Sequence, residues 1–246
     1  MRALFIPWTF LRVLLTLTVV CLLLAGMTQF VITLNQDIAE TSGRSEADSV
    51  VRRGPPVNKV ALTINVDWGQ EHIQALLDSL SRHQAKATFF FTGRFADNFP
   101  EYVTKVHEAG HEVGNHGYSH PHPTQISEGA NREEIRRTHG ALVKLTGLAP
   151  KWFAPPYGEL DERVLSTARQ EGYRTILWTV DSADWLKPSP QEWMKRVTAG
   201  IGPGALVLMH PTAPTVQALP SLLNYIKEKG WQAVTLTELL GTAERP

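Results

Sequence analysis

Short apolar runs alternate with helix-like stretches through most of this sequence, between residues 59 and 240. The apolar runs carry few polar residues, which is typical of strands buried on both faces of a parallel sheet; they lie at 60–66, 87–93, 152–154, 175–180, 205–209 and 232–236. Between them, apolar residues recur at helical spacing; these stretches lie at 72–80, 98–109, 126–146 and 216–229. The alternation predicts an α/β domain with a parallel sheet covered by helices.

Two architectures fit this pattern, a (β/α) barrel and an open doubly wound sheet, and the spacing of the elements does not separate them. The sequence has no Gly-x-Gly-x-x-Gly after its first predicted strand and no phosphate-loop lysine motif, so a nucleotide-binding fold is disfavoured. The roughly 180 residues of this part are enough for one domain that buries about 70% of its unfolded surface.

The first 58 residues differ in composition from the rest of the chain. Arg2 and Arg12 precede an uncharged, mostly apolar run at 13–36, and about 20 such residues are enough for a helix to cross a bilayer. We expect a cytoplasmic N-terminus at 1–12 and an uncleaved signal anchor at 13–36, because the arginines precede the span. A cleaved signal ending near Ala25 and a buried helix of a soluble protein are the alternatives.

After the expected span, residues 37–58 are polar and contain a Gly-Pro-Pro sequence, which predicts a linker. The predicted organisation is therefore a single-pass membrane anchor, a linker, an extracytoplasmic domain at 59–240 and a short tail at 241–246. Basic and acidic residues number 24 each, so we expect no nucleic acid partner. The single cysteine, Cys21, excludes an intrachain disulfide.

Polar side chains gather where the predicted strands end. In chain order they are Asn65 and Asp67, His116 and His120 (after a short strand near 112–114), the run 155–158, Asp181 and Asp184, and His210. In a parallel barrel, the carboxyl ends of the strands meet at one mouth, where functional residues collect. The sequence therefore predicts one polar site built from five strand ends. Trp178 lies inside the apolar run at 175–180, and we expect it in the core.

His116 and His120 are candidate metal ligands. Five of the nine histidines lie between residues 107 and 122. If 116–120 form one helical turn, both imidazoles project from the same face. Two neutral imidazoles on one face suit a divalent metal, most often zinc. Such pairs also arise by chance among histidines that only pack or face solvent, so the pair by itself does not establish a site.

Taken together, these segments resemble the polysaccharide deacetylases, the NodB-homology domain of carbohydrate esterase family 4. The similarity covers essentially all of residues 59–240, with the family's motifs in the family's order. They are Val-Ala-Leu-Thr at 60–63, Lys-Ala-Thr-Phe-Phe-Phe-Thr-Gly at 86–93, Gly-His-Glu-Val-Gly-Asn-His-Gly-Tyr-Ser-His at 110–120, Phe-Ala-Pro-Pro-Tyr-Gly at 153–158, Trp-Thr-Val-Asp-Ser-Ala-Asp-Trp at 178–185 and Leu-Val-Leu-Met-His at 206–210. The resemblance implies a distorted (β/α) barrel and metal-dependent removal of acetyl groups from N-acetylated sugars.

The resemblance also assigns roles to individual residues. His116, His120 and Asp67 would hold a divalent metal, Zn²⁺ or alternatively Co²⁺. His210 would be the catalytic acid that protonates the leaving amine, and Asp181 or Asp184 would orient its imidazole. Such a metal would activate a water molecule and polarise the amide carbonyl.

The substrate groove follows from the same resemblance. Pro156 and Tyr157 belong to the groove motif, in which a backbone N–H helps to hold the oxyanion, and Trp185 and Leu208 would line the acetyl pocket. For a domain anchored outside the membrane, peptidoglycan is the substrate we expect first. The sequence does not identify the glycan itself.

Two positions depart from the family's pattern. Asn65 stands where the family has its general-base aspartate, and an amide cannot take up a proton at neutral pH. Ala154 replaces the arginine that normally pairs with that aspartate. The joint loss is consistent, because an arginine without its carboxylate would be a buried, unpaired cation. An extra residue, Val66, separates Asn65 from Asp67, and both can still face the mouth because side chains two apart share a face of a strand.

Three hypotheses follow from this pattern. The first is a working deacetylase in which Asp67, Glu71 or His72 helps the attacking water. The second is a catalytically silent domain that binds metal and glycan in the same groove. The third is a purely structural protein of the cell envelope, which the retained histidines argue against.

Overall fold

The structure is a computed structural model that describes residues 26–30, which are helical, and residues 50–241. The chain divides into two units, Met1–Asp48 and Ser49–Pro246, and only the second is described at length below. Most of the membrane span expected at 13–36 lies outside the described residues. Among the residues that are described, no helix has the length and apolar character that crossing a membrane requires.

One parallel sheet organises the larger unit, as the sequence predicts. Its described strands are β1 (Val50–Val51), β2 (Lys59–Val66), β3 (Thr88–Phe91), β4 (Glu112–Asn115), β5 (Trp152–Phe153), β6 (Arg174–Ile176), β7 (Val180–Asp181), β8 (Leu206–Met209) and β9 (Gln232–Val234). They follow the order β1-β6-β5-β4-β3-β2-β8-β7, with β9 also paired to β2. The pairings between these strands are all parallel.

The sheet curls into a distorted barrel because of how β6 and β7 are joined. These strands stand near opposite ends of the strand order, yet only residues 177–179 separate them. A residue spans at most about 3.5 Å of chain, so the two ends of the sheet must lie close together. Leu177 donates its N–H to Val51 at one end and Thr179 donates to Leu206 near the other. The barrel expected from the family resemblance is confirmed in this curled, distorted form.

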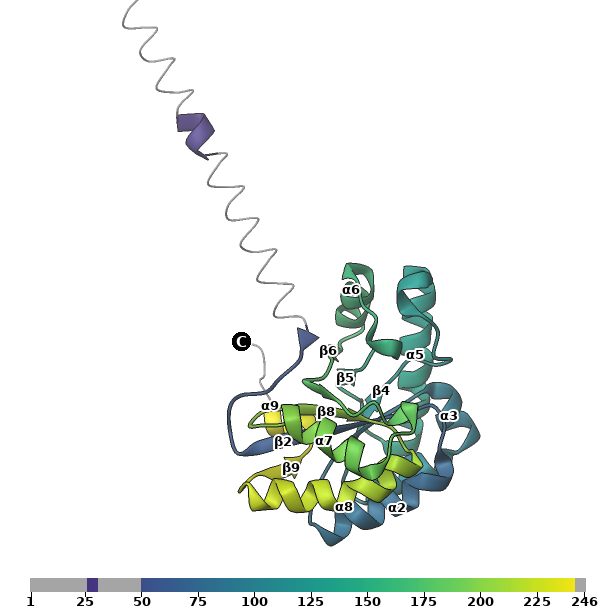
Figure 1. The fold of residues 1–246 in the computed structure, drawn as a ribbon. Coiled ribbons are helices and arrows are strands. Elements are labelled where there is room, and N and C mark those ends of the chain that lie inside the picture. The colour runs from purple at the N-terminus through teal and green to yellow at the C-terminus, as the bar shows by residue number, and fades with distance from the viewer. Residues whose placement is uncertain (1–25, 31–49, 242–246) are drawn as a thin grey trace, which may run out of the picture. The chain divides into compact units, whose positions relative to one another are not determined.

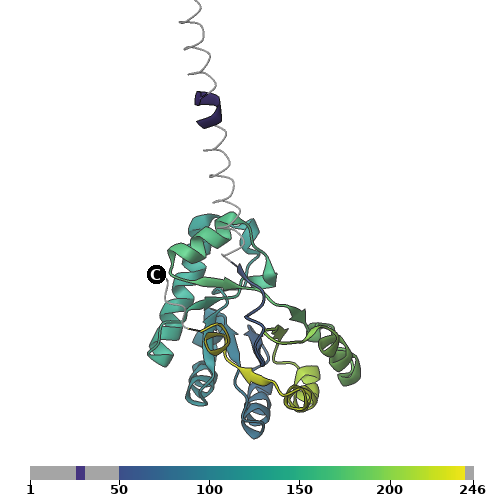
Figure 2. The same ribbon diagram turned by 90° about the vertical axis from the view of Figure 1, so that its left-hand side faces the viewer.

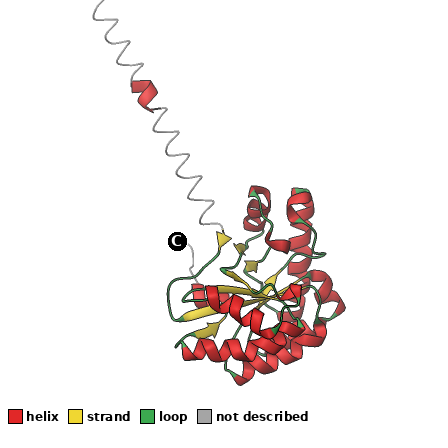
Figure 3. Cartoon of the chain, in the orientation of Figure 1, coloured by secondary structure: helices red, strands yellow, loops and turns green. Residues whose placement is uncertain are grey.

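Helices cover the outside of the curled sheet (Figures 1, 2 and 3). Those of the larger unit are α2 (Gln70–Arg82), α3 (Gly93–Asn98), α4 (Pro100–Glu108), α5 (Glu128–Thr146), α6 (Glu162–Gln170), α7 (Pro190–Gly200), α8 (Ala213–Glu228) and α9 (Leu236–Leu240), with short 3₁₀ turns η1 (Pro123–Gln125), η2 (Pro156–Gly158) and η3 (Asp184–Leu186). Between the helices and the sheet lies the main apolar core. A second apolar cluster fills the inside of the curl.

β2 shows how the fold aims side chains at the site. Its alternate residues Leu62, Ile64 and Val66 are fully buried in the core under the helices. Ala61 belongs to the inner cluster, so the alternation of side chains also directs Asn65 inward, at the carboxyl end of the strand. The sequence therefore anticipates correctly which face of this strand reaches the mouth.

The structure differs from the sequence-based expectation at several places, among them the helices α6, α7 and α9, which are not among the predicted elements. The strand expected at 175–180 is two short strands, β6 and β7, with Trp178 between them. A helix, α3, begins directly after β3, because the Thr92 hydroxyl accepts the Phe95 N–H and caps it. In the stretch expected as a linker, β1 pairs with β6.

Candidate functional site

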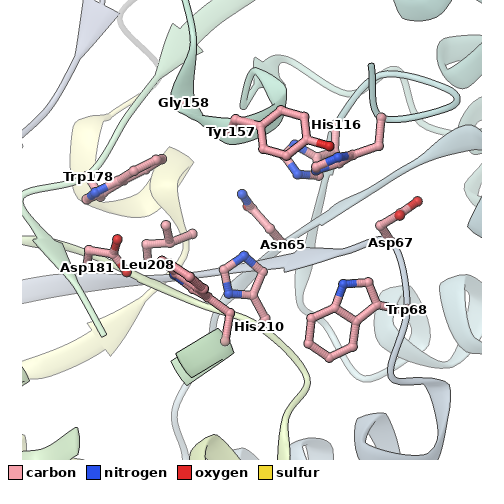
Figure 4. A pocket seen from close by; sticks show the side chains of 12 residues that line it. Asn65, Asp67, Trp68, His116, Tyr157, Gly158, Trp178, Asp181, Leu208 and His210 are labelled. Atoms are coloured by element: carbon pink, nitrogen blue, oxygen red, sulfur yellow. The ribbon is translucent and has the colours of Figure 1, made fainter. Parts of the chain in front are cut away.

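A cavity of about 400 Å³ opens at the carboxyl ends of the strands and is called the mouth pocket below (Figure 4). Its lining residues are Asn65, Asp67, Trp68, His116, His120, Tyr157, Gly158, Trp178, Asp181, Trp185, Leu208 and His210. These residues lie in the last part of β2, β7 and β8 or shortly after β2, β4, β5, β6, β7 and β8, so the strand ends do converge as the sequence predicts. Three other predicted positions, Ala154, Pro156 and Asp184, are buried next to this lining.

His210 is held by a buried carboxylate. Its Nδ1–H donates to Asp184 Oδ1 at 2.8 Å, and its backbone N–H donates to Oδ2 at 2.6 Å. The hydroxyls of Thr212 and Thr215 donate to the same Oδ2 at 3.2 and 2.6 Å. Since Nδ1 carries the proton, Nε2 is the nitrogen left for the pocket. Between the two aspartates that the sequence leaves open, Asp184 is therefore the partner of His210, while the Asp181 carboxylate accepts the Ala183 N–H.

The charge state of Asp184 follows from these contacts. Its side chain is 0% exposed, and burial by itself would raise the pKa of the carboxyl. The hydrogen bonds from His210 and Thr215 outweigh the burial, so the pKa of Asp184 is lowered from its ordinary value. The residue is a fixed anion beneath the imidazole, which suits an imidazole that must carry a positive charge for part of a reaction.

His116 and His120 come together through a loop and not through a helical turn. Gly117 and His120 both have positive φ, and the two rings lie 4.9 Å apart. The Nδ1–H of His116 donates to the Ala154 carbonyl at 2.6 Å, which leaves Nε2 free. Burial, and then the neighbouring His120, lower the pKa of His116 to about 3. Both features favour the neutral imidazole that a metal ligand requires, but the helical turn considered from the sequence is wrong.

Asp67 does not join the histidines. Its Oδ1 accepts the Thr92 hydroxyl at 2.9 Å, and Arg94 Nη2 donates to Oδ1 at 3.0 Å and to Oδ2 at 2.8 Å. Figure 4 shows the carboxylate directed away from Asn65 and the middle of the pocket. Within residues 26–30 and 50–241, no three His, Cys, Asp or Glu side chains are grouped so as to hold a metal ion. The side chains as arranged do not fit the three-ligand metal site, which stays a prediction.

Asn65 and Ala154 occupy the positions at which the family's base and its arginine are expected. Asn65 is 5% exposed, and its Oδ1 has no hydrogen-bond partner in the described part of the chain. Ala154 is buried in the inner apolar cluster with Trp152 and Ile176. A buried acceptor without a partner costs about 1–3 kcal/mol, which a bound donor could recover.

Aromatic rings surround the opening of the mouth pocket. Trp68 is 46% exposed, and Tyr157 and Trp185 are each 54% exposed. Tyr157 has φ +59° and stacks on His122 at 4.0 Å, while Trp68 lies parallel to His210 at 6.2 Å between centroids. Such rings offer flat apolar faces to a ligand in the opening.

Sequence reasoning missed several residues of this site. Trp178, expected in the core, lines the pocket because β6 and β7 separate around it, and a side chain at Gly158 would lie 2.4 Å from its ring. Trp68 lies shortly after the end of β2, and Arg94 lies in the first turn of α3, after β3. No periodicity marks these two positions, although the place of each just after a strand end could have suggested them.

The comparisons with known proteins agree on one family. The family model for polysaccharide deacetylases matches residues 52–176. YlxY, an uncharacterized protein of Bacillus subtilis (strain 168), is 39% identical over 195 residues, which are 79% of this chain but only 61% of YlxY. A peptidoglycan-N-acetylglucosamine deacetylase of Bacillus cereus is 35% identical over 196 residues, covering 77% of this chain and 71% of that protein.

A solved structure adds a relative of another kind. BA3943 of Bacillus anthracis, described as a pseudoenzyme of carbohydrate esterase family 4, superposes with a TM-score of 0.77 at 39% identity. The match covers 78% of this chain and 69% of that one. A mutant of the same protein, described as having restored enzymatic activity, superposes with the same TM-score. The chain is therefore similar both to a protein named as a deacetylase and to one described as a pseudoenzyme.

Proposed function

Because this chain belongs to the polysaccharide deacetylase family, we propose that its mouth pocket binds an N-acetylated glycan of the cell envelope without deacetylating it at an enzyme's rate. Peptidoglycan is the first substrate class to test, since the similar Bacillus cereus protein is named for it. The domain would act outside the membrane, carried by the anchor expected at 13–36.

Residues at the rim and floor of the mouth pocket support the proposal that the pocket binds a glycan. Trp68, Tyr157 and Trp185 present exposed rings around the opening, on which the apolar faces of sugar rings can stack. On the floor, Leu208 offers an apolar contact for a methyl group. Asn65 Oδ1 is a buried acceptor without a partner among the described residues, which an amide N–H of an acetamido group would satisfy.

The proposed lack of deacetylation rests on the amide of Asn65 where the family resemblance expects the general base, and on Ala154 where it expects the arginine. An amide cannot act as a general base, and general-base catalysis contributes about 10²–10⁴-fold to a rate. The other residues that the sequence offers to help the attacking water are poorly placed for that role. Asp67 is paired with Arg94, and Glu71 and His72 line a neighbouring hollow instead of the mouth pocket.

A working deacetylase is the second candidate, and the His210–Asp184 pair favours it. The imidazole and its buried carboxylate have the hydrogen bonds that a general acid needs. The retained pair is also compatible with descent from an active enzyme. The BA3943 mutant described as restored shows that a similar silent protein can regain activity.

Two assays on the purified chain separate the candidates. Acetate release from N-acetylated peptidoglycan fragments and chitooligosaccharides is measured with added Zn²⁺ or Co²⁺, and glycan binding is measured by calorimetry. We expect binding without acetate release above a His210→Ala control. Release that depends on His210 would instead establish the enzyme, and absence of binding to every N-acetylated glycan would remove both candidates.

Point variants then locate the binding. Trp185→Ala should weaken glycan binding, because its exposed ring lies at the opening of the mouth pocket. Leu148→Ala is the matched control: Leu148 is 62% exposed, but it belongs to a different hollow, together with Gly110 and Lys151. Equal affinities of the two variants would place the glycan elsewhere on the domain.

A further inference from the structure

We propose that Arg94 holds the Asp67 carboxylate away from His116 and His120, so that Arg94 competes with a divalent cation for the carboxylate after β2. The inference concerns the metal site of this chain and does not depend on glycan binding. It explains why the described side chains include two neighbouring neutral imidazoles but no third ligand beside them.

Arg94 and Thr92 are positioned by the start of α3. The Thr92 hydroxyl caps this helix and donates to Asp67 Oδ1, and the backbone N–H of Thr92 donates to the Val66 carbonyl at 3.0 Å. The backbone N–H of Arg94 donates to the Tyr118 carbonyl at 3.0 Å, within the loop that carries the histidines. The backbone that carries Arg94 is thus tied to the end of β2 on one side and to the histidine loop on the other.

The extra residue of β2 brings Asp67 within reach of this helix. Val66 extends the strand and is fully buried in the core, with its partner Phe91 at the end of β3. Asp67 is therefore the first residue beyond the strand, level with the Thr92–Arg94 segment that follows β3. A carboxylate one residue earlier would stand at the position of Val66, inside the strand.

The ion pair is well placed to resist a competing cation. One guanidinium nitrogen donates to both carboxylate oxygens, and the Asp67 side chain is only 17% exposed although Arg94 is 50% exposed. Partial burial reduces the screening that weakens surface ion pairs. A divalent cation at the same oxygens would also face the positive charge of Arg94.

Metal affinity tests this directly. Zn²⁺ and Co²⁺ binding to the purified full-length chain is measured by calorimetry, with thermal unfolding as a check that each variant folds. Arg94→Gln should bind either ion roughly tenfold more tightly than the unmodified chain, as expected for loss of about 1.4 kcal/mol of competition. Arg94→Lys keeps the positive charge that competes with the cation, so its gain should be smaller than that of Arg94→Gln.

Two further variants make the test specific. In Arg94→Gln/Asp67→Asn the gain should disappear, since the released carboxylate is gone. Arg163→Gln is the matched control, because Arg163 also donates two hydrogen bonds to one aspartate, Asp161, and is 55% exposed. Its metal affinity should equal that of the unmodified chain.

Unchanged metal affinity in both Arg94 variants would overturn the proposal, and so would a gain that persists without the Asp67 carboxylate. Glycan binding of Arg94→Gln, measured in metal-free buffer, tests the proposed function separately from the proposed role of Arg94. If the gain in metal affinity appears and no glycan binds, the proposed function fails and the role of Arg94 stands. Glycan binding without any gain in metal affinity would leave the proposed function intact and remove the role of Arg94.

Discussion

Two sides of the mouth pocket differ: the His210 wall, which is His210 with Asp184 behind it, and the Asp67 wall, which is Asn65 and Asp67 with Ala154 nearby. On the His210 wall, Asp184 is fully buried and accepts four hydrogen bonds, two of them from His210 itself. On the Asp67 wall, the Asn65 Oδ1 has no partner among the described residues, and the carboxylate is bound to Arg94 instead of facing the histidines. Both walls stand at the carboxyl ends of the same sheet. The fold therefore forms the mouth pocket whether or not the groups on each wall are arranged for catalysis.

The two walls differ in what their polar groups do for stability. Asp184 begins η3, and its partners come from the end of β8 and the start of α8, so the network joins these three segments. Asn65 makes no comparable link through its Oδ1, and the side chain of Ala154 adds only an apolar contact. Removing a polar group from the His210 wall should therefore affect folding, whereas removing one from the Asp67 wall should mainly affect binding and activity.

The largest effect expected is that of Asp184→Asn. The substitution removes a buried anion and places an amide N–H₂ among donors, so we expect a loss of about 3 kcal/mol in the free energy of unfolding. Chemical denaturation measures it. Asp181→Asn is the control, because that side chain accepts the Ala183 N–H and an amide oxygen can still do so. Equal losses of unfolding free energy in the two variants would show that Asp184 contributes no more to stability than Asp181 does.

Next comes the joint restoration of Asn65→Asp and Ala154→Arg. Each single change buries an unpaired charge and should destabilise the fold, whereas together the two charges can pair, giving a coupling of about 2 kcal/mol in a double-mutant cycle. A restored base should also raise acetate release in the presence of Zn²⁺ by about 10²-fold or more. Strictly additive stabilities with no gain in release would show that these positions do not face each other as the family resemblance implies.

The pH dependence of stability should reveal His116. Burial, and then His120, lower its pKa from 6.5 to about 3, so between these values the unfolded chain binds a proton that the folded chain does not. Stability is therefore lost as the pH falls through this window, by about 2.3 kcal/mol between pH 6.5 and 4.5 from this group. His116→Asn should flatten the profile by that amount, and parallel profiles for the two chains would contradict the assignment.

The smallest effect expected is at the rim. Trp68→Ala should weaken glycan binding by roughly tenfold or less, the range for one aromatic contact, and leave the affinity for Zn²⁺ unchanged. Calorimetry with each ligand measures both. A variant that lost metal affinity but kept glycan affinity would place Trp68 in the Asp67 wall and not in the rim.

Much of the fold follows from local pattern. The buried run of β2 and the helical spacing of α2 and α8 each predict their element within a few residues, because an apolar face must be covered whatever its partners are. The exceptions have local causes: the Thr92 cap begins a helix that periodicity does not mark, and the chain turns across the open side of the sheet between Ile176 and Val180. The site is less predictable, since its chemistry depends on contacts between distant segments.

The sequence by itself determined the parallel strand–helix order and the polar residues at the strand ends, because these depend on residue type and local spacing; that Asn65 replaces a base aspartate stays a prediction from the family resemblance. Only the tertiary structure decided that Asp184 and not Asp181 supports His210, and that Asp67 pairs with Arg94 and not with the histidines. The physical reason is that hydrogen bonds act over about 3 Å, so small displacements along neighbouring strands and helices choose the partner.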